Sequence, residues 1–190
     1  MNDLQAILRL KFGDIGGLDA LVARYQVRAL RTAFLITQDA ALAQDVVQDA
    51  FLSAYRAIHG FQLGKPFAPW FMRIVVNGAI QTARRGQQYA ALTADDEEDD
   101  FDVSEGISAV SLEQTVEAAQ TEAAIWAALA DLAPERRAVI VLRYYLELSE
   151  SEMAAHLAIP VGTVKSRLHA AKRQLRDRLT PEYRTNQDGR

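Results

Sequence analysis

Hydrophobic residues recur at helical spacing along most of this chain, and polar residues fill the positions between them. Between residues 15 and 36, for example, the apolar side chains at 18, 21, 22, 25, 29 and 33 fall on one stripe, as on one face of an amphipathic helix. The same pattern predicts helices over residues 15–36, 39–58, 70–85, 118–132, 134–145, 150–157 and 161–179. The expected fold class is therefore all-α.

Local signals mark the ends of several predicted helices. Thr37 and Asp39 offer N-cap oxygens for a helix that His59-Gly60 ends. Pro134 suits a first helical position. Ser149-Glu150-Ser151-Glu152 matches the S-x-x-E capping box, which predicts the start of a short helix.

The hydrophobic periodicity weakens between residues 87 and 117, which divides the chain into two parts. This segment contains the run DDEEDDFD at 95–102. Such a composition buries too little apolar surface to offset its ordering entropy, so we expect a flexible acidic linker. The predicted organisation is a helical domain at 1–88, the linker at 89–117, a second helical domain at 118–180 and a polar tail at 181–190.

The net charge of −4 hides an uneven distribution. Residues 1–91 carry 10 basic and 6 acidic side chains, residues 92–122 carry 11 acidic and no basic ones, and residues 123–190 carry 11 basic and 8 acidic ones. Such blocks act on their surroundings almost independently, because salt screens charges beyond roughly 8 Å. Two basic blocks flanking an acidic segment are compatible with nucleic-acid binding.

Several classes of protein lack support. There is no Cys, which excludes disulfides and thiolate metal sites. The first 11 residues lack the apolar core of a signal peptide, and no run approaches the roughly 20 apolar residues of a membrane span. The three histidines are far apart, and the P-loop and G-x-S-x-G motifs are absent. We expect a non-catalytic, cytoplasmic protein without metal or other cofactor.

The most informative pattern is a short helix, a turn and a longer helix over 150–179, which is typical of a helix-turn-helix. The outer face of its second helix carries hydroxyls and cations: Thr163, Lys165, Ser166, Arg167, His169, Lys172, Arg173 and Arg176. In a major groove Lys, Ser and His can donate to base edges, while Arg and Thr hold phosphates. A solvated basic face is the alternative, but the capped helix and turn before it favour DNA binding.

Two segments together resemble a known family. LSESEMAAHLAIPV followed by GTVKSRLHAAKRQL is similar to the region 4 helix-turn-helix of bacterial sigma-70 factors of the extracytoplasmic-function (ECF) group. DVVQDAFLSAYRAI followed by PFAPWFMRIVVNGAIQTARR resembles region 2 of that group. The two resemblances occur in the family's order and cover nearly all of residues 15–179.

The resemblance implies a sigma factor that binds core RNA polymerase, directs it to promoters and helps to melt the −10 element. Region 2 would contact the β′ clamp helices of the polymerase through one stripe of the second helix: Asp45, Gln48, Asp49 and Leu52. The −10 element would bind a loop and the third helix: Gln62, Phe67, Arg73, Asn77, Gln81, Arg84 and Arg85. Region 4 would meet the β flap and bind the −35 element: Thr163, Lys165, Ser166, Arg167, His169, Lys172 and Arg173.

The residues agree with these roles in part. Asn77 and Gln81 can hydrogen-bond base edges, and the arginines can neutralise phosphates. Phe67 has two open interpretations, a wall for a base flipped out of the strand or core packing. From its residue types alone, the stripe that begins at Asp45 is a solvated face that includes one leucine, Leu52.

The chain departs from the family pattern at three positions. Gln81 replaces a usual Asp, Ala170 replaces a usual Arg, and Ala158 stands where the turn usually has Gly. If residue 158 requires a positive φ, alanine costs stability there.

The resemblance leaves room for an anti-sigma factor as a further partner, and it suggests that the acidic run imitates RNA inside the polymerase. The alternative functions are a DNA-binding regulator that acts without core polymerase, and an interaction scaffold for an acidic partner.

Overall fold

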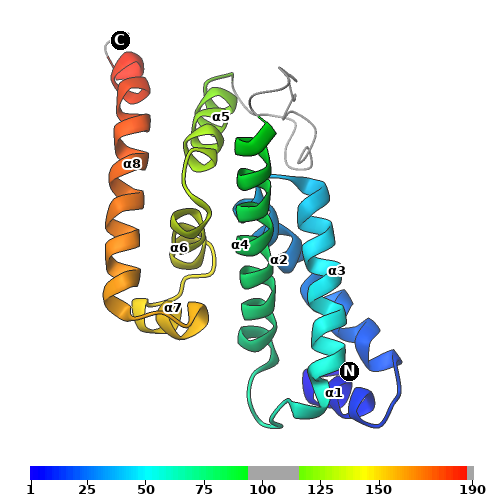
Figure 1. Ribbon diagram of the computed structural model, residues 1–190. Coiled ribbons are helices and arrows are strands. Elements are labelled where there is room, and N and C mark those ends of the chain that lie inside the picture. Colours follow the sequence, from blue (N-terminus) through cyan, green and yellow to red (C-terminus); the bar gives the residue numbers. More distant parts are fainter. Residues whose placement is uncertain (94–115, 188–190) are drawn as a thin grey trace. The chain divides into compact units, whose positions relative to one another are not determined.

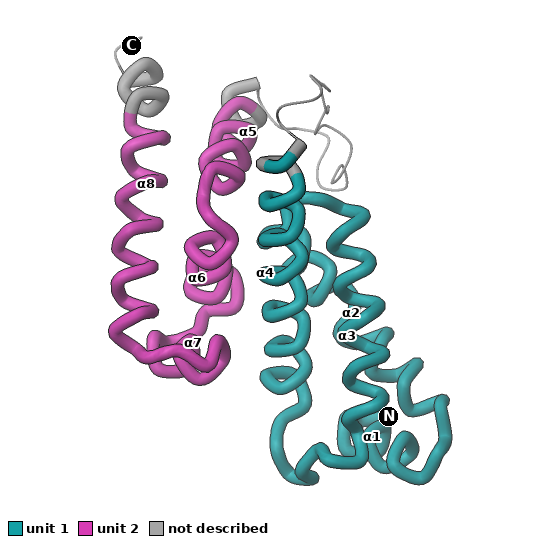
Figure 2. The backbone as a smooth tube through the Cα atoms, in the orientation of Figure 1, with its two compact units in different colours: residues 1–92 teal, residues 93–190 magenta. Residues whose placement is uncertain are grey.

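The computed structural model describes residues 1–93 and 116–187, which belong to two compact units, Met1–Leu92 and Thr93–Arg190 (Figures 1 and 2). All regular structure in the described residues is helical, which confirms the all-α prediction. The acidic run at 95–102, with the expectations attached to it, lies outside the described residues. Within the described part, no helix combines the length and hydropathy that a membrane span requires.

Unit 1 is built from four α-helices and one 3-10 turn. They are α1 (Asp3–Lys11), α2 (Gly16–Thr37), α3 (Ala40–Ala57), η1 (Ile58–Gly60) and α4 (Phe67–Thr93). Helix α2 packs against both α1 and α3, and small buried residues such as Ala29, Ala33, Ala43 and Ala50 line these contacts. The Asp39 carboxylate accepts from the backbone N–H of Leu42 at 2.8 Å, so Asp39, of the two predicted candidates, is the N-cap of α3.

Helix α1 was not among the predicted elements. It begins with a reciprocal capping box, in which Asn2 and Gln5 each accept from the other's backbone N–H. Its inner face buries Ala6, Ile7 and Leu10. A Cβ at Gly17 would stand 2.3 Å from the Ala6 carbonyl oxygen, so a glycine is needed where α2 crosses α1.

Aromatic side chains form the part of the core where α2, α3 and α4 meet. The ring of Phe71 lies 4.4 Å from that of Phe51 and 5.6 Å from that of Phe67, centroid to centroid. Tyr25 of α2 lies 5.4 Å from Phe67. These separations are within the range of favourable aromatic pairs, so Phe67 is an integral part of this cluster.

Helix α4 extends beyond its predicted ends at 70 and 85. It begins at Phe67 with Pro69 in its first turn, where a missing N–H costs nothing. It continues to Thr93, so residues 89–93, which were predicted to begin the flexible linker, are helical instead.

Unit 2 contains α5 (Val116–Ala130), α6 (Pro134–Tyr144), α7 (Glu150–Leu157) and α8 (Val161–Gln187). Helix α8 contacts each of the other three, and Leu132, Leu142, Met153 and Val164 are fully buried between them. Helix α6 begins at Pro134 as predicted. Helix α8 was predicted to end at about 179 but runs on to Gln187.

A buried arginine holds the C-terminal end of α5. The Arg137 guanidinium donates to the carbonyl oxygens of Leu129 at 2.8 Å, Ala130 at 2.7 Å and Leu132 at 3.0 Å. The first two carbonyls belong to the last turn of α5, where carbonyls lack an intrahelical donor, and the third belongs to the turn that follows. Burial lowers the pKa of Arg137 to about 10, so the side chain remains a cation at neutral pH.

Candidate nucleic-acid and polymerase interface

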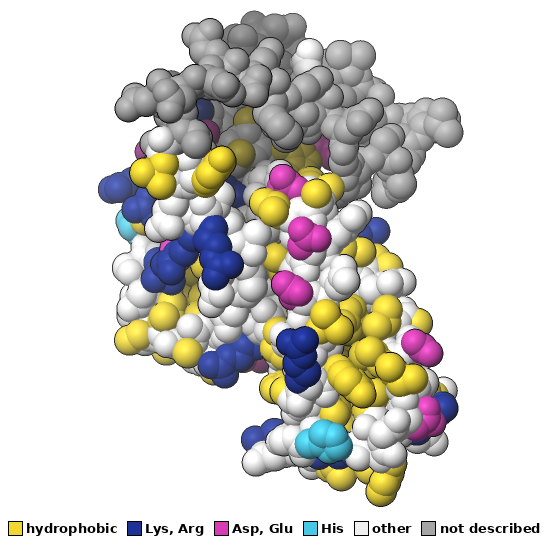
Figure 3. Space-filling model, turned by 45° about the vertical axis from the view of Figure 1, so that its right-hand side comes forward, with side chains coloured by type: hydrophobic (Ala, Val, Ile, Leu, Met, Phe, Trp, Pro, Cys, Tyr) yellow, Lys and Arg dark blue, Asp and Glu magenta, His cyan; other side chains and the backbone are white. Residues whose placement is uncertain are grey.

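The outer face of α3 carries the predicted polymerase-binding stripe. Asp45, Gln48, Asp49 and Leu52 are all exposed, and their i, i+3, i+4, i+7 spacing puts them on one face. The opposite face of the helix buries Val46, Ala50 and Ala54. Leu52 is 41% exposed, which gives this acidic stripe an apolar contact point. Figure 3 shows acidic side chains next to exposed hydrophobic ones on the face it draws.

The loop between η1 and α4 has an exposed tip and a buried base. Residues 62–66 are exposed, the Lys65 N–H donates to the Gln62 carbonyl oxygen at 3.3 Å, and Gly64 has φ +91°. Gln62 is therefore placed for contact with an external ligand.

Phe67 is placed differently from the prediction. Its side chain is 2% exposed and packs between Tyr25, Trp70 and Phe71. The prediction that Phe67 walls an exposed base-binding pocket is wrong for this structure, because α4 begins at this residue and directs the ring into the core. Of the two interpretations left open, core packing holds.

The outer face of α4 carries the other predicted −10 residues. Arg73, Gln81, Arg84 and Arg85 are exposed and Asn77 is half-buried. Phe71, Val75 and Val76 fill the buried side. The exposed residues recur about one turn apart, so the structure gathers two amides and three cations on one helical face, directly after the loop that holds Gln62.

In unit 2, α7 and α8 form the predicted helix-turn-helix. The Ser149 N–H donates to the Glu152 carboxylate at 2.8 Å and the Glu152 N–H donates to the Ser149 hydroxyl at 3.3 Å, which confirms the capping box. The Ser149 hydroxyl also donates to the Glu152 carboxylate at 2.6 Å, and this bond, together with the one from the Ser149 N–H, lowers the pKa of Glu152. The turn begins at Ala158, which adopts φ 54° and ψ 44°. The suspected positive φ at this non-glycine residue is thus present.

The outer face of α8 presents the predicted −35 residues. Lys165, Ser166, His169, Lys172 and Arg173 are exposed, and Thr163 and Arg167 are half-buried. Val164, Leu168 and Ala171 bury the opposite side. All seven predicted residues therefore belong to one helix whose inner face is fixed in the core of unit 2.

Two further side chains contact this basic face and were missed by the sequence analysis. Glu150 Oε2 lies 3.8 Å from Lys165 Nζ, and Lys172 Nζ lies 5.6 Å from the ring centroid of Tyr144, within reach of a cation–π interaction. Both partners come from other helices, so no spacing along α8 could indicate them.

The second half of α8 is bonded to the turn between α5 and α6. Gln174 donates to the Asp131 carbonyl oxygen at 2.9 Å, and Arg178 forms an ion pair with the Asp131 carboxylate. Among the described residues, no group of three or more His, Asp or Glu side chains is arranged to hold a metal ion.

Comparison with known proteins places both units in one family. The family model for sigma-70 region 2 matches residues 21–89, and the model for sigma-70 region 4 matches residues 122–175. RNA polymerase sigma-H factor of Pseudomonas aeruginosa is 32% identical over 188 residues, which cover 96% of each chain. ECF RNA polymerase sigma factor SigW of Bacillus subtilis is 30% identical over 181 residues, 91% of this chain and 94% of that one.

Two solved structures have a similar fold. CnrH in complex with the cytosolic domain of CnrY aligns over 94% of this chain and 97% of that chain, with a TM-score of 0.62 and 24% identity. The sigma factor RpoE of Bartonella quintana, in complex with the anti-sigma factor NepR, aligns over 85% of this chain and 96% of that chain, with a TM-score of 0.63 and 20% identity.

Proposed function

The chain belongs to the ECF group of the sigma-70 family, and we propose that its two units divide promoter recognition between them. As a sigma factor it binds core RNA polymerase and directs it to promoters. In our proposal it acts in the cytoplasm, where polymerase and promoter DNA meet, and has no catalytic activity of its own.

Unit 1 binds polymerase and opens the −10 element. The acidic stripe on α3 at Asp45, Gln48, Asp49 and Leu52 docks on the β′ clamp helices. The face of α4 from Arg73 to Arg85, with Gln62 of the preceding loop, holds the separated strand. The supporting observation is that one helical face combines two amides that can read base edges, exposed Gln81 and half-buried Asn77, with exposed cations that can hold phosphates.

Unit 2 holds the −35 element as a duplex. The seven polar residues of α8 from Thr163 to Arg173 enter the major groove, as the second helix of a helix-turn-helix does. Glu150 and Tyr144 flank this surface. The ion pair with Glu150 orients Lys165, and the contact with the Tyr144 ring orients Lys172. An anti-sigma factor is a further partner we propose, because the similar RpoE structure contains one.

Reconstitution with core RNA polymerase tests the function directly. A promoter library randomised over the −35 and −10 positions is transcribed with the purified chain, and the transcripts are sequenced. We expect a consensus with two separated elements. The absence of both a complex with core polymerase and a selected consensus would instead favour a regulator that acts without polymerase.

Single substitutions then test the division between the units. Lys165→Ala and His169→Ala should each weaken −35 duplex binding by about tenfold, the usual scale for a lost base contact. Asn77→Ala should leave duplex binding unchanged and slow promoter opening. Arg28→Ala, which removes an exposed cation of α2 outside both surfaces, is the matched control. If Lys165→Ala, His169→Ala and Asn77→Ala all changed duplex affinity equally, the proposed division would be contradicted.

A further inference from the structure

The exposed loop at 62–66 is held at its base by two buried rings. Phe61 and Phe67, which flank it, are 6% and 2% exposed, and their centroids lie 5.9 Å apart in an edge-to-face arrangement. A short segment between two fixed ends has few conformations to lose on binding. How firmly the two ends are fixed therefore governs how well this loop selects a ligand.

The leading end of the loop is held by the last residue of α1. The Lys11 ammonium donates to the His59 carbonyl oxygen at 2.9 Å and to the Phe61 carbonyl oxygen at 2.8 Å. Both hydrogen bonds are charge-assisted, and they hold the backbone where the chain leaves η1. Lys11 is half-buried and its ammonium group donates to these two carbonyls. It therefore holds the loop rather than binding an external phosphate.

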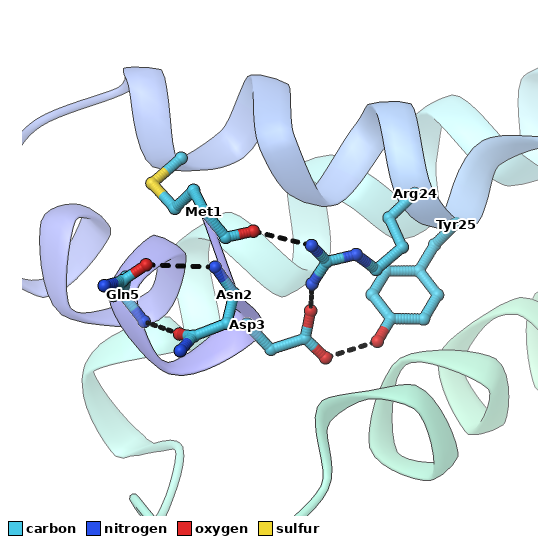
Figure 4. A network of polar contacts seen from close by, with 6 residues as sticks. All are labelled: Met1, Asn2, Asp3, Gln5, Arg24 and Tyr25. Atoms are coloured by element: carbon cyan, nitrogen blue, oxygen red, sulfur yellow. Dashed lines mark hydrogen bonds and ion pairs between the residues drawn. The ribbon is translucent and has the colours of Figure 1, made fainter.

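The trailing end is also connected to α1. The ring of Tyr25 packs on Phe67 with centroids 5.4 Å apart. The Tyr25 hydroxyl donates to the Asp3 carboxylate, which also forms an ion pair with Arg24 (Figure 4). The first turn of α1 thus fixes the tyrosine that supports Phe67.

We propose that α1 is a positioning element for the 62–66 loop, with Lys11 as its principal contact, and that it sets how selectively the loop binds an unpaired base of the −10 strand. This inference rests on the proposed function of unit 1. The match to the region 2 family model begins at residue 21, so α1 lies before the segment to which that model applies.

Substitution of Lys11 in the full-length protein tests the proposal. Lys11→Met keeps the length of the side chain and removes both hydrogen bonds. Polymerase holoenzyme is titrated with single-stranded non-template DNA randomised at the −10 positions. We expect about tenfold weaker binding, which corresponds to about 1.4 kcal/mol and is part of the stabilisation lost with the two hydrogen bonds. We also expect a flattened base preference at the position next to the loop.

Two variants control for charge and for folding. Arg9→Met removes a cation of the same helix that pairs with Asp14 and does not contact the loop, so it should bind like the wild type. Lys11→Arg keeps a donor and should restore most of the affinity and base preference. Hydrogen exchange of Lys11→Met should speed up at the amides of residues 59–66. Faster exchange throughout unit 1 would mean a general structural role and would overturn the proposal.

The comparison with Asn77→Ala tests the role of α1 separately from the proposed binding of the −10 strand by unit 1. If Asn77→Ala loses strand binding while Lys11→Met keeps wild-type affinity and base preference, α1 does not position the loop. If neither variant changes strand binding, the assignment of the −10 surface to unit 1 is itself wrong, and the role of α1 is rejected with it.

Discussion

Replacing Ala158 with glycine should stabilise unit 2, because this residue is held in the left-handed region at φ 54° and ψ 44°. Its conformation is imposed by the turn. The Ala158 N–H donates to the Ala154 carbonyl oxygen, and the Ile159 N–H donates to the same atom at 3.1 Å. Both bonds use the backbone alone, so glycine keeps them.

The size of the effect follows from two opposing terms. A residue with a Cβ costs about 1–2 kcal/mol in the left-handed region. Glycine gives back about 0.4–1 kcal/mol through the greater freedom of the unfolded chain. The net gain for Ala158→Gly is therefore about 0.5–1 kcal/mol, since the side chain is exposed and its removal leaves no cavity.

Native-state hydrogen exchange in the full-length protein measures this gain within unit 2. Amides of buried residues such as Met153 and Val164 exchange through unfolding of the unit, so their exchange should slow by about two- to fivefold. Ala155→Gly is the matched control, because Ala155 is exposed within α7 and glycine there should cost about 0.5–1 kcal/mol. Faster exchange in both variants would refute the argument from backbone strain.

Three further predictions concern residues that hold the helix ends or helix contacts of the two units. Arg137→Met should destabilise unit 2 by about 2–3 kcal/mol in urea unfolding, because three buried hydrogen bonds to the end of α5 and the turn after it are lost. Gly17→Ala should destabilise unit 1 by about 1–3 kcal/mol, because its Cβ would clash with α1. Gly86→Ala, where no atom lies within 4 Å of the added Cβ, should instead stabilise α4 by about 0.5–1 kcal/mol. Urea unfolding measures both glycine variants. Ser149→Ala should raise the pKa of Glu152 toward its ordinary value of 4.5 in an NMR titration. The folded-state pKa is depressed, so this carboxylate stabilises unit 2 above about pH 4.5, and that contribution fades as the pH falls through the folded-state pKa; the variant should lose less stability on acidification.

Helix ends with local signals were predictable from the sequence. Asp39, Pro134 and the Ser149 capping box act within one turn of themselves, so the starts of α3, α6 and α7 lie within one residue of their predicted positions. The surface character of α3, α4 and α8 was predictable for the same reason, because helical periodicity decides which side chains face outward.

Features that depend on tertiary contacts were not predictable in this way. Phe67 follows a proline in a segment rich in loop-forming residues, yet its ring enters the core through contacts with Tyr25 and Phe71, which lie elsewhere in the chain. Lys11 binds carbonyls 48 and 50 residues away, and a cation's spacing along its own helix carries no information about such partners. The roles of the outer faces came from the family resemblance, since an exposed acidic or basic stripe has the same periodicity whatever it binds.

The placement of the two tryptophans makes the units distinguishable by fluorescence. Trp70 belongs to the aromatic cluster, with its centroid 5.0 Å from that of Phe61 at the base of the 62–66 loop, while Trp126 lies on α5 in unit 2. The chain has no other tryptophan. In a Trp126→Phe background the remaining emission would follow the loop during strand capture, and in a Trp70→Phe background it would follow unit 2. One protein thus carries two optical reporters, each selected by a single conservative substitution.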